Sequence, residues 1–447
     1  MSKCYEFFHP SDAYSAKQIL FFVTFVLGLT PLRLHGPTGN RKITISRLGY
    51  SATILQVIFF MFCYIYSFIH DESIVGYFFK SEISKIGDTL QKFIGMTGLL
   101  TLFGTSLWKC WDIIYLFQTI SSTDVRFLDL GVVFNFQYVM KLINSKLFLI
   151  FSLNFFYVSS SLWLLFRNDI WPSLQAIVSF FTPHIYLLTI VVLFMSFLIR
   201  LSQHFEMLNK VLKNLSHQWD NRNTKSIAHK QRSLQCLDSF SMYTMVSKDP
   251  SEIIQESMEI HHLICDAAST ANKYFTYQLL TIISIAFLII VFDAYYVLET
   301  ILGKSTRGSK FKPVEFVTFF SCQMILYLIA IISIVEGSNR AIKKSKKTGG
   351  IVHSLLNKAK TPEVKEKLQQ FSMQLLHLKI NFTAAGLFNI DRTLYFTISG
   401  ALTTYLIILL QFTSTAPNGQ QMAVDNELSS ELALMNLSNF SIDNNIS

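Results

Sequence analysis

Polar and charged side chains within long apolar segments are the residues of this chain that could do chemistry. Most of them cluster near one end of these segments: Trp163, His184, Asp293, Tyr296, Glu299, Glu315, Thr318 and Gln323. Polar groups are costly inside a membrane unless they are satisfied or functional. Planar polar side chains can hydrogen-bond hydroxyl groups while ring faces cover C–H patches, so the set predicts binding of a small sugar. The alternative is a belt of interfacial residues, which fits the aromatic members equally well.

Hydroxyl and amide groups recur in the last apolar segment, residues 391–412, whose charged residues are the first two. Such groups around a common axis could hydrate a cation, and a ring of aliphatic or aromatic side chains can gate a pore by dewetting. The pore and gate candidates are Thr404, Ile407, Leu410, Gln411 and Phe412. The alternative is that the small hydroxyl residues only let helices pack closely in lipid.

The composition indicates which elements position these residues. The chain has 447 residues, of which 51% are hydrophobic and 15% charged, with 41 Phe. This is more apolar surface than a soluble domain could bury. A membrane helix needs about 20 apolar residues. We therefore predict an all-α polytopic membrane protein with seven spans, at residues 45–70, 84–108, 144–166, 174–201, 274–297, 314–336 and 391–412.

The distribution of the 38 Lys and Arg residues predicts the orientation. Most precede the first span or lie between spans two and three, four and five, or six and seven, which makes those loops cytoplasmic. The basic loop between spans five and six disagrees, but later loops weigh less. We expect the N-terminus inside and the C-terminus outside, where the sequons at Asn436, Asn439 and Asn445 could be glycosylated.

The predicted organisation is one chain of spans with uneven loops. Residues 1–44 form a cytosolic N-terminal segment whose apolar run at 19–30 is too short to span and is expected to be an interfacial helix. The other predicted regions are transmembrane helices one to four at 45–201, a cytosolic helical extension with a flexible linker at 202–273, transmembrane helices five and six at 274–336, a cytosolic anchor segment at 337–390, the pore-lining helix at 391–412 and an extracellular tail at 413–447.

Several function classes lack support. The sequence contains no nucleotide-binding loop, no HExxH and no GxSxG motif, so we expect no enzyme. The six cysteines show no metal-binding spacing and no pair in outer loops, so we expect no metal, cofactor or structural disulfide. Nucleic acid is not an expected partner. A G-protein-coupled receptor would need the opposite orientation, and a secondary transporter would be expected to show repeats.

The pore segment closes on Thr404-Tyr405, five aliphatic residues and Gln411-Phe412. At the end of a seven-span chain, this pattern resembles the signature of the insect gustatory receptor family, and residues 389–405 look most like its fructose-receptor branch. The resemblance implies a tetrameric ligand-gated cation channel with a pore lined by the last helix. It also implies a ligand pocket within spans two to six, and a cytosolic anchor built from residues 202–213, 253–273, 334–356 and 364–388.

We therefore expect a homotetrameric, non-selective cation channel of the plasma membrane, opened by a small sugar, with fructose favoured. A bitter or broadly tuned receptor of the same family is the alternative ligand class. Assembly with other gustatory receptors is the alternative to a homotetramer. The expected partners are thus a sugar ligand, membrane lipid and further receptor subunits.

Overall fold

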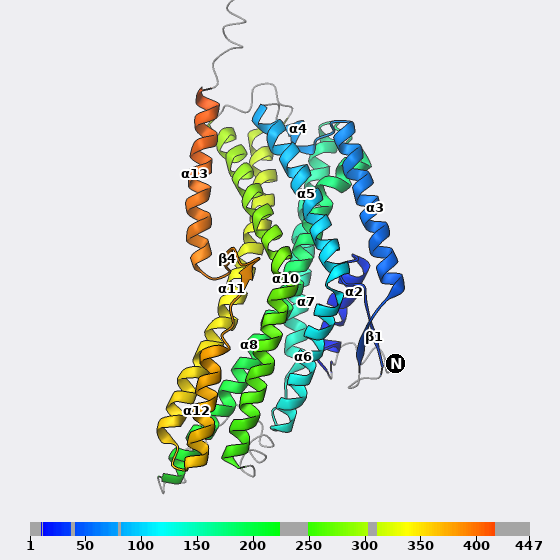
Figure 1. Ribbon diagram of the computed structural model, residues 1–447. Coiled ribbons are helices and arrows are strands. Elements are labelled where there is room, and N and C mark those ends of the chain that lie inside the picture. Colours follow the sequence, from blue (N-terminus) through cyan, green and yellow to red (C-terminus); the bar gives the residue numbers. More distant parts are fainter. Residues whose placement is uncertain are drawn as a thin grey trace, which may run out of the picture. The chain divides into compact units, whose positions relative to one another are not determined.

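The computed structural model describes residues 10, 12–36, 41–78, 82–223, 249–302 and 311–415. The chain divides into two compact units, Met1–Ile398 and Ser399–Ser447, and each is described by itself. In the first unit we call upper the end that carries α4, and lower the end that carries α12 (Figure 1). The predicted glycosylation sites Asn436, Asn439 and Asn445 lie outside the described residues.

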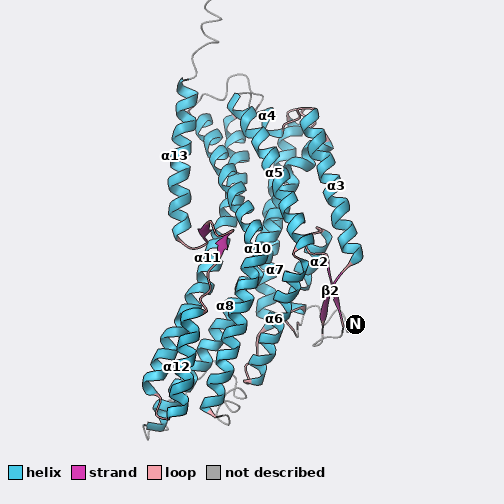
Figure 2. Cartoon of the chain, in the orientation of Figure 1, coloured by secondary structure: helices cyan, strands magenta, loops and turns pink. Residues whose placement is uncertain are grey.

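Helices make up nearly all of the described chain, together with two short pairs of strands (Figure 2). In chain order the elements are η1 (Ser15–Lys17), α2 (Gln18–Val26), β1 (Leu32–His35), β2 (Lys42–Ile45), α3 (Arg47–Ile69), α4 (Ile74–Phe78), α5 (Glu82–Trp108), α6 (Cys110–Asp129), α7 (Phe136–Arg167), α8 (Leu174–Asn223), α10 (Pro250–Ile301), α11 (Pro313–Lys358), α12 (Pro362–His377), β3 (Thr383–Ala384), β4 (Phe388–Asn389) and α13 (Thr393–Thr415).

Six of the described helices are long and apolar enough to cross a membrane, and they contain α3, α7, α8, α10, α11 and α13. The remaining predicted span corresponds to α5, a helix of 27 residues that packs against α3, α8 and α10. Its upper half is less apolar because it carries Asp88 and Lys92, which pair with each other. The predicted all-helical membrane fold is confirmed.

The centre of the first unit is α8, which packs against α3, α5, α7, α10 and α11. Within its most apolar stretch, 94% of the residues are buried. A helix that is apolar on all sides is expected at the core of a bundle, because it has no polar face to offer to solvent. The polar residues of the upper end lie on α8 and on the helices that pack around it.

Three helices are much longer than a membrane span. α8, α10 and α11 have 50, 52 and 46 residues, against about 20 needed to cross a bilayer. α8 and α10 continue below the spans predicted at 174–201 and 274–297, into the segment 202–273 where a helical extension was predicted. At the lower end α6 packs on α10, and α12 packs on both α10 and α11. The predicted linker lies mostly in 224–248, outside the described residues.

The N-terminal segment forms a short helix and a hairpin beside α3. The nine-residue α2 is too short to span a membrane, as predicted. Gly28 ends it with φ +65°, where L-residues with a side chain are strained. The hydroxyl of Thr53 and the amide of Gln56 donate to the Gly28 and Val26 carbonyls, at 3.0 and 2.8 Å. These bonds hold the segment against α3.

The stretch before α13 holds a feature that the sequence did not predict. Within residues 364–388, which the resemblance assigned to the cytosolic anchor, α12 ends at His377 and a β3–β4 hairpin follows. Ala385 and Gly386 turn the hairpin with φ +50° and +74°. Side chains of α10 supply its remaining partners: Asn272 accepts from the Thr383 amide at 2.9 Å, and Thr276 from the Ala385 amide at 2.8 Å. Hydrogen bonds to α10 thus satisfy backbone amides of the hairpin that a longer α12 would have satisfied within the helix.

Candidate functional site

Gln323 lies at the centre of a fully buried polar cluster in the upper half of the first unit. Its Oε1 accepts a hydrogen bond from the Tyr157 hydroxyl at 3.1 Å, and its Nε2 lies 3.1 Å from His184 Nε2. The rings of Tyr157 and His184 are 5.6 Å apart. Three helices, α7, α8 and α11, thus meet through side chains that are at most 2% exposed. The sequence indicated Gln323 and His184 as site residues but not Tyr157.

A cavity lies beside this cluster, between α5, α8, α10 and α11, with a free volume of about 30 Å³. That is room for about one or two water molecules. Its lining is mostly apolar, with five polar side chains. The lining residues are Gly87, Leu90, Gln91, Lys92, Ile94, Gly95, Ser179, Phe180, Pro183, His184, Ile285, Leu288, Ile289, Phe292 and Tyr327.

Several polar atoms at and near the cavity are buried with no hydrogen-bond partner among the described residues. They include the hydroxyls of Tyr64 and Tyr327, His184 Nδ1 and Asp293 Oδ2. Buried polar groups are nearly always hydrogen-bonded, so each such atom needs an explanation, such as a water or a ligand. Two of these groups, His184 and Tyr327, are on the cavity wall, with rings 5.4 Å apart.

Two glycines of α5 allow tyrosine hydroxyls to approach the helix closely. A Cβ added at Gly95 would lie 2.7 Å from the Tyr64 hydroxyl, and one at Gly87 would lie 2.3 Å from the Tyr296 hydroxyl. Both distances are shorter than a Cβ atom can approach an oxygen without one of them moving. The absence of a side chain at these positions therefore maintains both the free space and the tyrosine positions.

A buried ion pair lies on α5 at the cavity wall. Lys92 Nζ is 2.9 Å from Asp88 Oδ2, and the two side chains are 10% and 7% exposed. The ammonium group also lies 6.0 Å from the centre of the Phe68 ring. The cavity thus has a cation on its wall whose charge is balanced by the adjacent carboxylate.

The remaining predicted ligand residues divide into two groups. Asp293, Tyr296 and Glu299 are buried on α10, at 2%, 2% and 6% exposure, but do not line the cavity.

Trp163, Glu315 and Thr318 lie away from it. Trp163 is 61% exposed, with Arg167 above its ring. Glu315 pairs with Arg167 at 3.6 Å and accepts from the Lys312 amide. The exposed Thr318 hydroxyl donates to the Val314 carbonyl.

Four residues at or near the cavity were not predicted from the sequence, and only Tyr327 could have been. Tyr327 is four residues after Gln323 on α11, so both lie on the same helix face. Tyr64 belongs to the first apolar segment, which the resemblance placed outside the pocket. Gly87 and Gly95 give no signal in a single sequence, because their role depends on tyrosines of other helices.

The start of α13 is attached to α11 by a two-pronged ion pair. Arg392 Nε and Nη2 each donate to a carboxylate oxygen of Glu336 at 2.9 Å. Asp391 caps the helix, since its Oδ1 accepts from the Thr393 amide at 2.9 Å. Arg392 thus ties the start of α13 to α11, while Asp391 acts as the cap of the helix.

From Ser399 onward α13 belongs to the second unit. Thr404, Ile407 and Gln411 follow at spacings of three and four, so they share one face of the helix. All three are exposed in the single chain, and Leu410 is half-buried. The Thr404 hydroxyl donates to the Gly400 carbonyl at 3.0 Å. The side chain of Phe412 lies outside the described residues.

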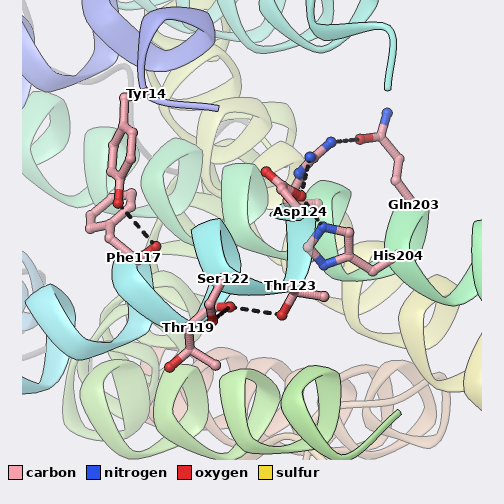
Figure 3. Close-up of polar contacts among 9 residues, drawn as sticks. Tyr14, Phe117, Thr119, Ser122, Thr123, Asp124, Gln203 and His204 are labelled. Atoms are coloured by element: carbon pink, nitrogen blue, oxygen red, sulfur yellow. Dashed lines mark hydrogen bonds and ion pairs between the residues drawn. The ribbon is translucent and has the colours of Figure 1, made fainter. Parts of the chain in front are cut away.

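A second buried charge cluster lies below the cavity, between α6 and α8 (Figure 3). Asp124 forms an ion pair with Arg200 and a 2.6 Å contact with His204 Nε2. The guanidinium carbon of Arg200 is 4.1 Å from the centre of the Phe134 ring. Burial alone would raise the pKa of the Asp124 carboxyl, but Arg200 and His204 together hold it below its usual value.

Lys17 is buried near this cluster and is 2% exposed. Its ammonium group lies 4.4 Å from the centre of the Phe197 ring and 5.2 Å from that of Phe117. Burial lowers the pKa of Lys17 to about 7, and the charge of Arg200 adds to the effect. No group of three or more potential metal ligands occurs within the described ranges.

Comparison with known proteins identifies the family. The sequence model of the 7tm chemosensory receptor family matches residues 18–415. A Drosophila melanogaster protein named as gustatory receptor 28b is 56% identical over 92% of this chain and 88% of its own length. Gustatory receptor 28a of the same species is 35% identical over 92% of this chain and 95% of its own.

Matches to relatives with a named taste are weaker and do not separate the ligand classes. The fly receptor for sugar taste 43a is 25% identical and the fly receptor for bitter taste 66a is 26% identical, each over 38% of this chain and over 38% and 32% of their own lengths, respectively.

The fold matches a solved insect olfactory receptor, OR5 from Machilis hrabei in complex with eugenol. The TM-score is 0.57 at 13% identity, over 90% of this chain and 100% of that one. The likeness shows a shared fold.

These matches place the chain among receptors rather than enzymes, as the sequence predicted. The chain belongs to the 7tm chemosensory receptor family and, within it, to the insect gustatory receptors.

Proposed function

We propose that this chain is a subunit of a ligand-gated, non-selective cation channel of the plasma membrane. A small polyhydroxylated ligand opens the channel, and fructose is the first to test. The observation that carries the proposal is the set of buried, unpartnered polar atoms at and near the cavity, including the Tyr327 hydroxyl and His184 Nδ1. A ligand with several hydroxyl groups offers donors and acceptors to both.

The chemistry of the cavity lining suits a compact ring. Phe180 and Phe292 contribute aromatic rings, while Gln91 and Ser179 add hydrogen-bonding groups. The free volume of about 30 Å³ is far smaller than the 300–1,000 Å³ typical of ligand pockets. Binding therefore requires the helices to separate. A ligand that binds only the expanded state shifts the equilibrium toward that state.

The helix α11 provides a continuous connection between the cavity and the pore helix. Gln323 and Tyr327 lie at its upper end, and Glu336, further along the same helix, holds Arg392 at the start of α13. The distance from Gln323 to Glu336 along the helix is about 20 Å at 1.5 Å per residue. We propose that expansion of the cavity tilts α11 and so pulls on the start of the pore helix.

The exposed surface of α13 supports assembly around a pore. Only 6% of its apolar stretch is buried in the single chain. In a homotetramer, the shared face of Thr404, Ile407 and Gln411 would meet the ion path, with Leu410 and Phe412 to either side of it, while the opposite face would meet neighbouring subunits or lipid. The predicted orientation puts the upper end of the first unit outside the cell.

An apolar, bitter-type ligand is the second candidate function. Leu288, Ile289, Ile285 and Phe292 make one wall of the cavity apolar. Hydroxyl-poor aromatic compounds could fill such a space, and OR5 was solved with one, eugenol. A ligand recognised by the polar wall would carry several hydroxyl groups, whereas one recognised by the apolar wall would carry few.

Whole-cell current recorded from cells that express only this chain tests the proposal. We expect a fast, reversible cation current during perfusion with fructose, and we expect Gln323→Leu to abolish it. Trp163→Leu is the matched control, because this side chain is exposed and away from the cavity. Silence to a sugar panel with normal surface labelling would refute the sugar assignment, and current to aromatic compounds instead would establish the second candidate.

A further inference from the structure

A shallow recess lies where α7 and α11 both pack on α8. Its floor is formed by Val191, Val192 and Met195 of the central helix, which are at most 7% exposed. Leu149 of α7 lies on the rim and is 52% exposed, so the recess opens on the outside of the bundle. Since α7 and α11 are both long and apolar enough to cross a membrane, we expect the opening to face lipid.

The recess has one polar end and one aliphatic end. Lys146 is the third residue of the span predicted at 144–166, and Ser333 is the fourth from the end of the span predicted at 314–336. These two spans run in opposite directions through the bilayer, so both residues lie near the same boundary of the membrane. Leu149 and Ile329 are about one helical turn nearer the bilayer centre. A polar end at the boundary and an aliphatic end inside match the polarity of a phospholipid.

The positive charge at the polar end is not balanced by a nearby acid. The Lys146 ammonium makes no hydrogen bond or ion pair with any described residue, and Arg340 is close enough for the two positive charges to repel each other. α7 contains no Asp or Glu. On α11, Glu336 is one turn from Arg340, but both of its oxygens accept from Arg392. The polar end therefore favours an anionic occupant.

The lining of the recess lies outside the segments that the resemblance assigned to subunit association. On α8 those segments begin at residue 202 and on α11 at residue 334, while α7 carries none of them. Lys146, Ser333 and the aliphatic side chains that line the recess all come before these limits or lie on α7. Arg340 falls within an anchor segment and is only a second contributor of charge.

We propose that this recess binds an anionic glycerophospholipid of the cytoplasmic leaflet. The phosphate would accept hydrogen bonds from Lys146 and Ser333, because ammonium groups are strong donors to phosphate oxygens. One acyl chain would lie over Leu149 and Ile329. The enclosed volume is only about 30 Å³, so the chain lies along the recess with its outer side against the bilayer.

The charge of the recess selects among anionic lipids. Basic pockets between membrane helices on the cytoplasmic side bind anionic headgroups, and phosphatidylserine is enriched in that leaflet. Two basic side chains suit a headgroup with one net negative charge better than a phosphoinositide with several. We therefore assign phosphatidylserine to the site. The assignment rests on the predicted orientation, in which this end of α7 is cytosolic.

Photolabelling of the full-length chain in lipid nanodiscs tests the inference without any taste ligand. The probe is phosphatidylserine with a diazirine on one acyl chain, in a phosphatidylcholine bilayer. We expect it to label the peptides that contain 146–150 and 329–333 at least fivefold more than phosphatidylcholine with the same acyl chain does. Equal labelling by the two lipids would show ordinary contact with the bilayer and overturn the site.

Variants of α7 locate the headgroup. Lys146→Gln should reduce labelling by the phosphatidylserine probe at least fivefold, and Lys146→Arg should retain it. Lys141→Gln is the matched control, because it removes the same charge from an exposed position of the same helix, about 140° around from Lys146. Equal loss in the control would show general charge attraction and overturn the site. If Lys146→Gln breaks the oligomer on size-exclusion chromatography, the recess is a subunit interface and the inference fails.

Competition on the unmodified chain tests the lipid class without a substitution. Unlabelled phosphatidylserine should displace the probe from the recess, whereas unlabelled phosphatidylcholine should not. Stronger displacement by a phosphoinositide would overturn the phosphatidylserine assignment. Absence of sugar current with intact, selective labelling would refute the proposed ligand of the channel alone, and absence of selective labelling with intact sugar current would refute the lipid site alone.

Discussion

Gly95→Ala tests whether the free space beside α5 is the ligand cavity. The added methyl group would lie 2.7 Å from the Tyr64 hydroxyl, so one of the two must move. Tyr64 is 1% exposed and cannot turn toward solvent. Overpacking of this kind costs about 1–3 kcal/mol. The gain in helix propensity on replacing Gly by Ala, about 0.5–1 kcal/mol, partly offsets it.

Gly104→Ala is the matched control on the same helix. A Cβ at Gly104 meets nothing within 4 Å, so only the gain in propensity remains. The difference in unfolding free energy between the two variants therefore isolates the overpacking cost of about 1–3 kcal/mol. Thermal unfolding followed by size-exclusion chromatography measures it. Adding Tyr64→Phe to Gly95→Ala removes the clashing oxygen and should restore stability.

The same variants report on ligand binding. Because the methyl group at Gly95 takes up part of a cavity of about 30 Å³, it should raise the half-maximal sugar concentration. We expect at least a tenfold increase, which corresponds to about 1.4 kcal/mol. Gly104→Ala should leave the dose-response curve unchanged. Identical melting and dose-response curves for both alanine variants would refute the assignment of the cavity.

Three other perturbations test the remaining contacts. Gln323→Leu leaves its two buried partners unbonded, so it should lower the free energy of unfolding by about 1–3 kcal/mol per group, measured by thermal unfolding. Reversing the charge at either Glu336 or Arg392 should reduce the maximal current at normal surface expression, and the double reversal should restore it; a single reversal without effect would refute the proposed link to the pore helix. Burial lowers the pKa of Lys17 to about 7. Above pH 7 the folded state therefore binds fewer protons at Lys17 than the unfolded state does. Stability should therefore rise by up to about 1.4 kcal/mol per pH unit above pH 7 and level off below it, measured against Lys17→Met, which should not show this slope.

Sequence patterns predicted the parts of the fold that depend on local length and composition. The apolar segments became membrane-spanning helices, and the short run at 19–30 became α2 at Gln18–Val26. α8 and α10 also continue beyond the predicted spans into residues 202–273, where the sequence predicted a helical extension. The hairpin at 383–389 was not, since its hydrogen-bond partners lie on α10, more than a hundred residues earlier.

The residues of the candidate site were also predicted only in part. His184 and Gln323 stand out in the sequence because each is a polar residue in an apolar segment, where burial is costly without a partner. Trp163 and Thr318 met the same criterion, yet the structure places them on the surface. One sequence does not show which face of a helix turns inward when both faces are apolar.

The sequence by itself determined the class of the protein: a helical membrane receptor whose family is evident from its last segment. Local hydrophobicity is sufficient for this, because a bilayer admits few other backbone structures. Only the tertiary structure decided which side chains share the cavity. Gly95, His184 and Tyr327 come from three different helices, and whether they line one cavity depends on how closely those helices pack. Packing distances of this kind are a property of the assembled bundle and not of any single segment.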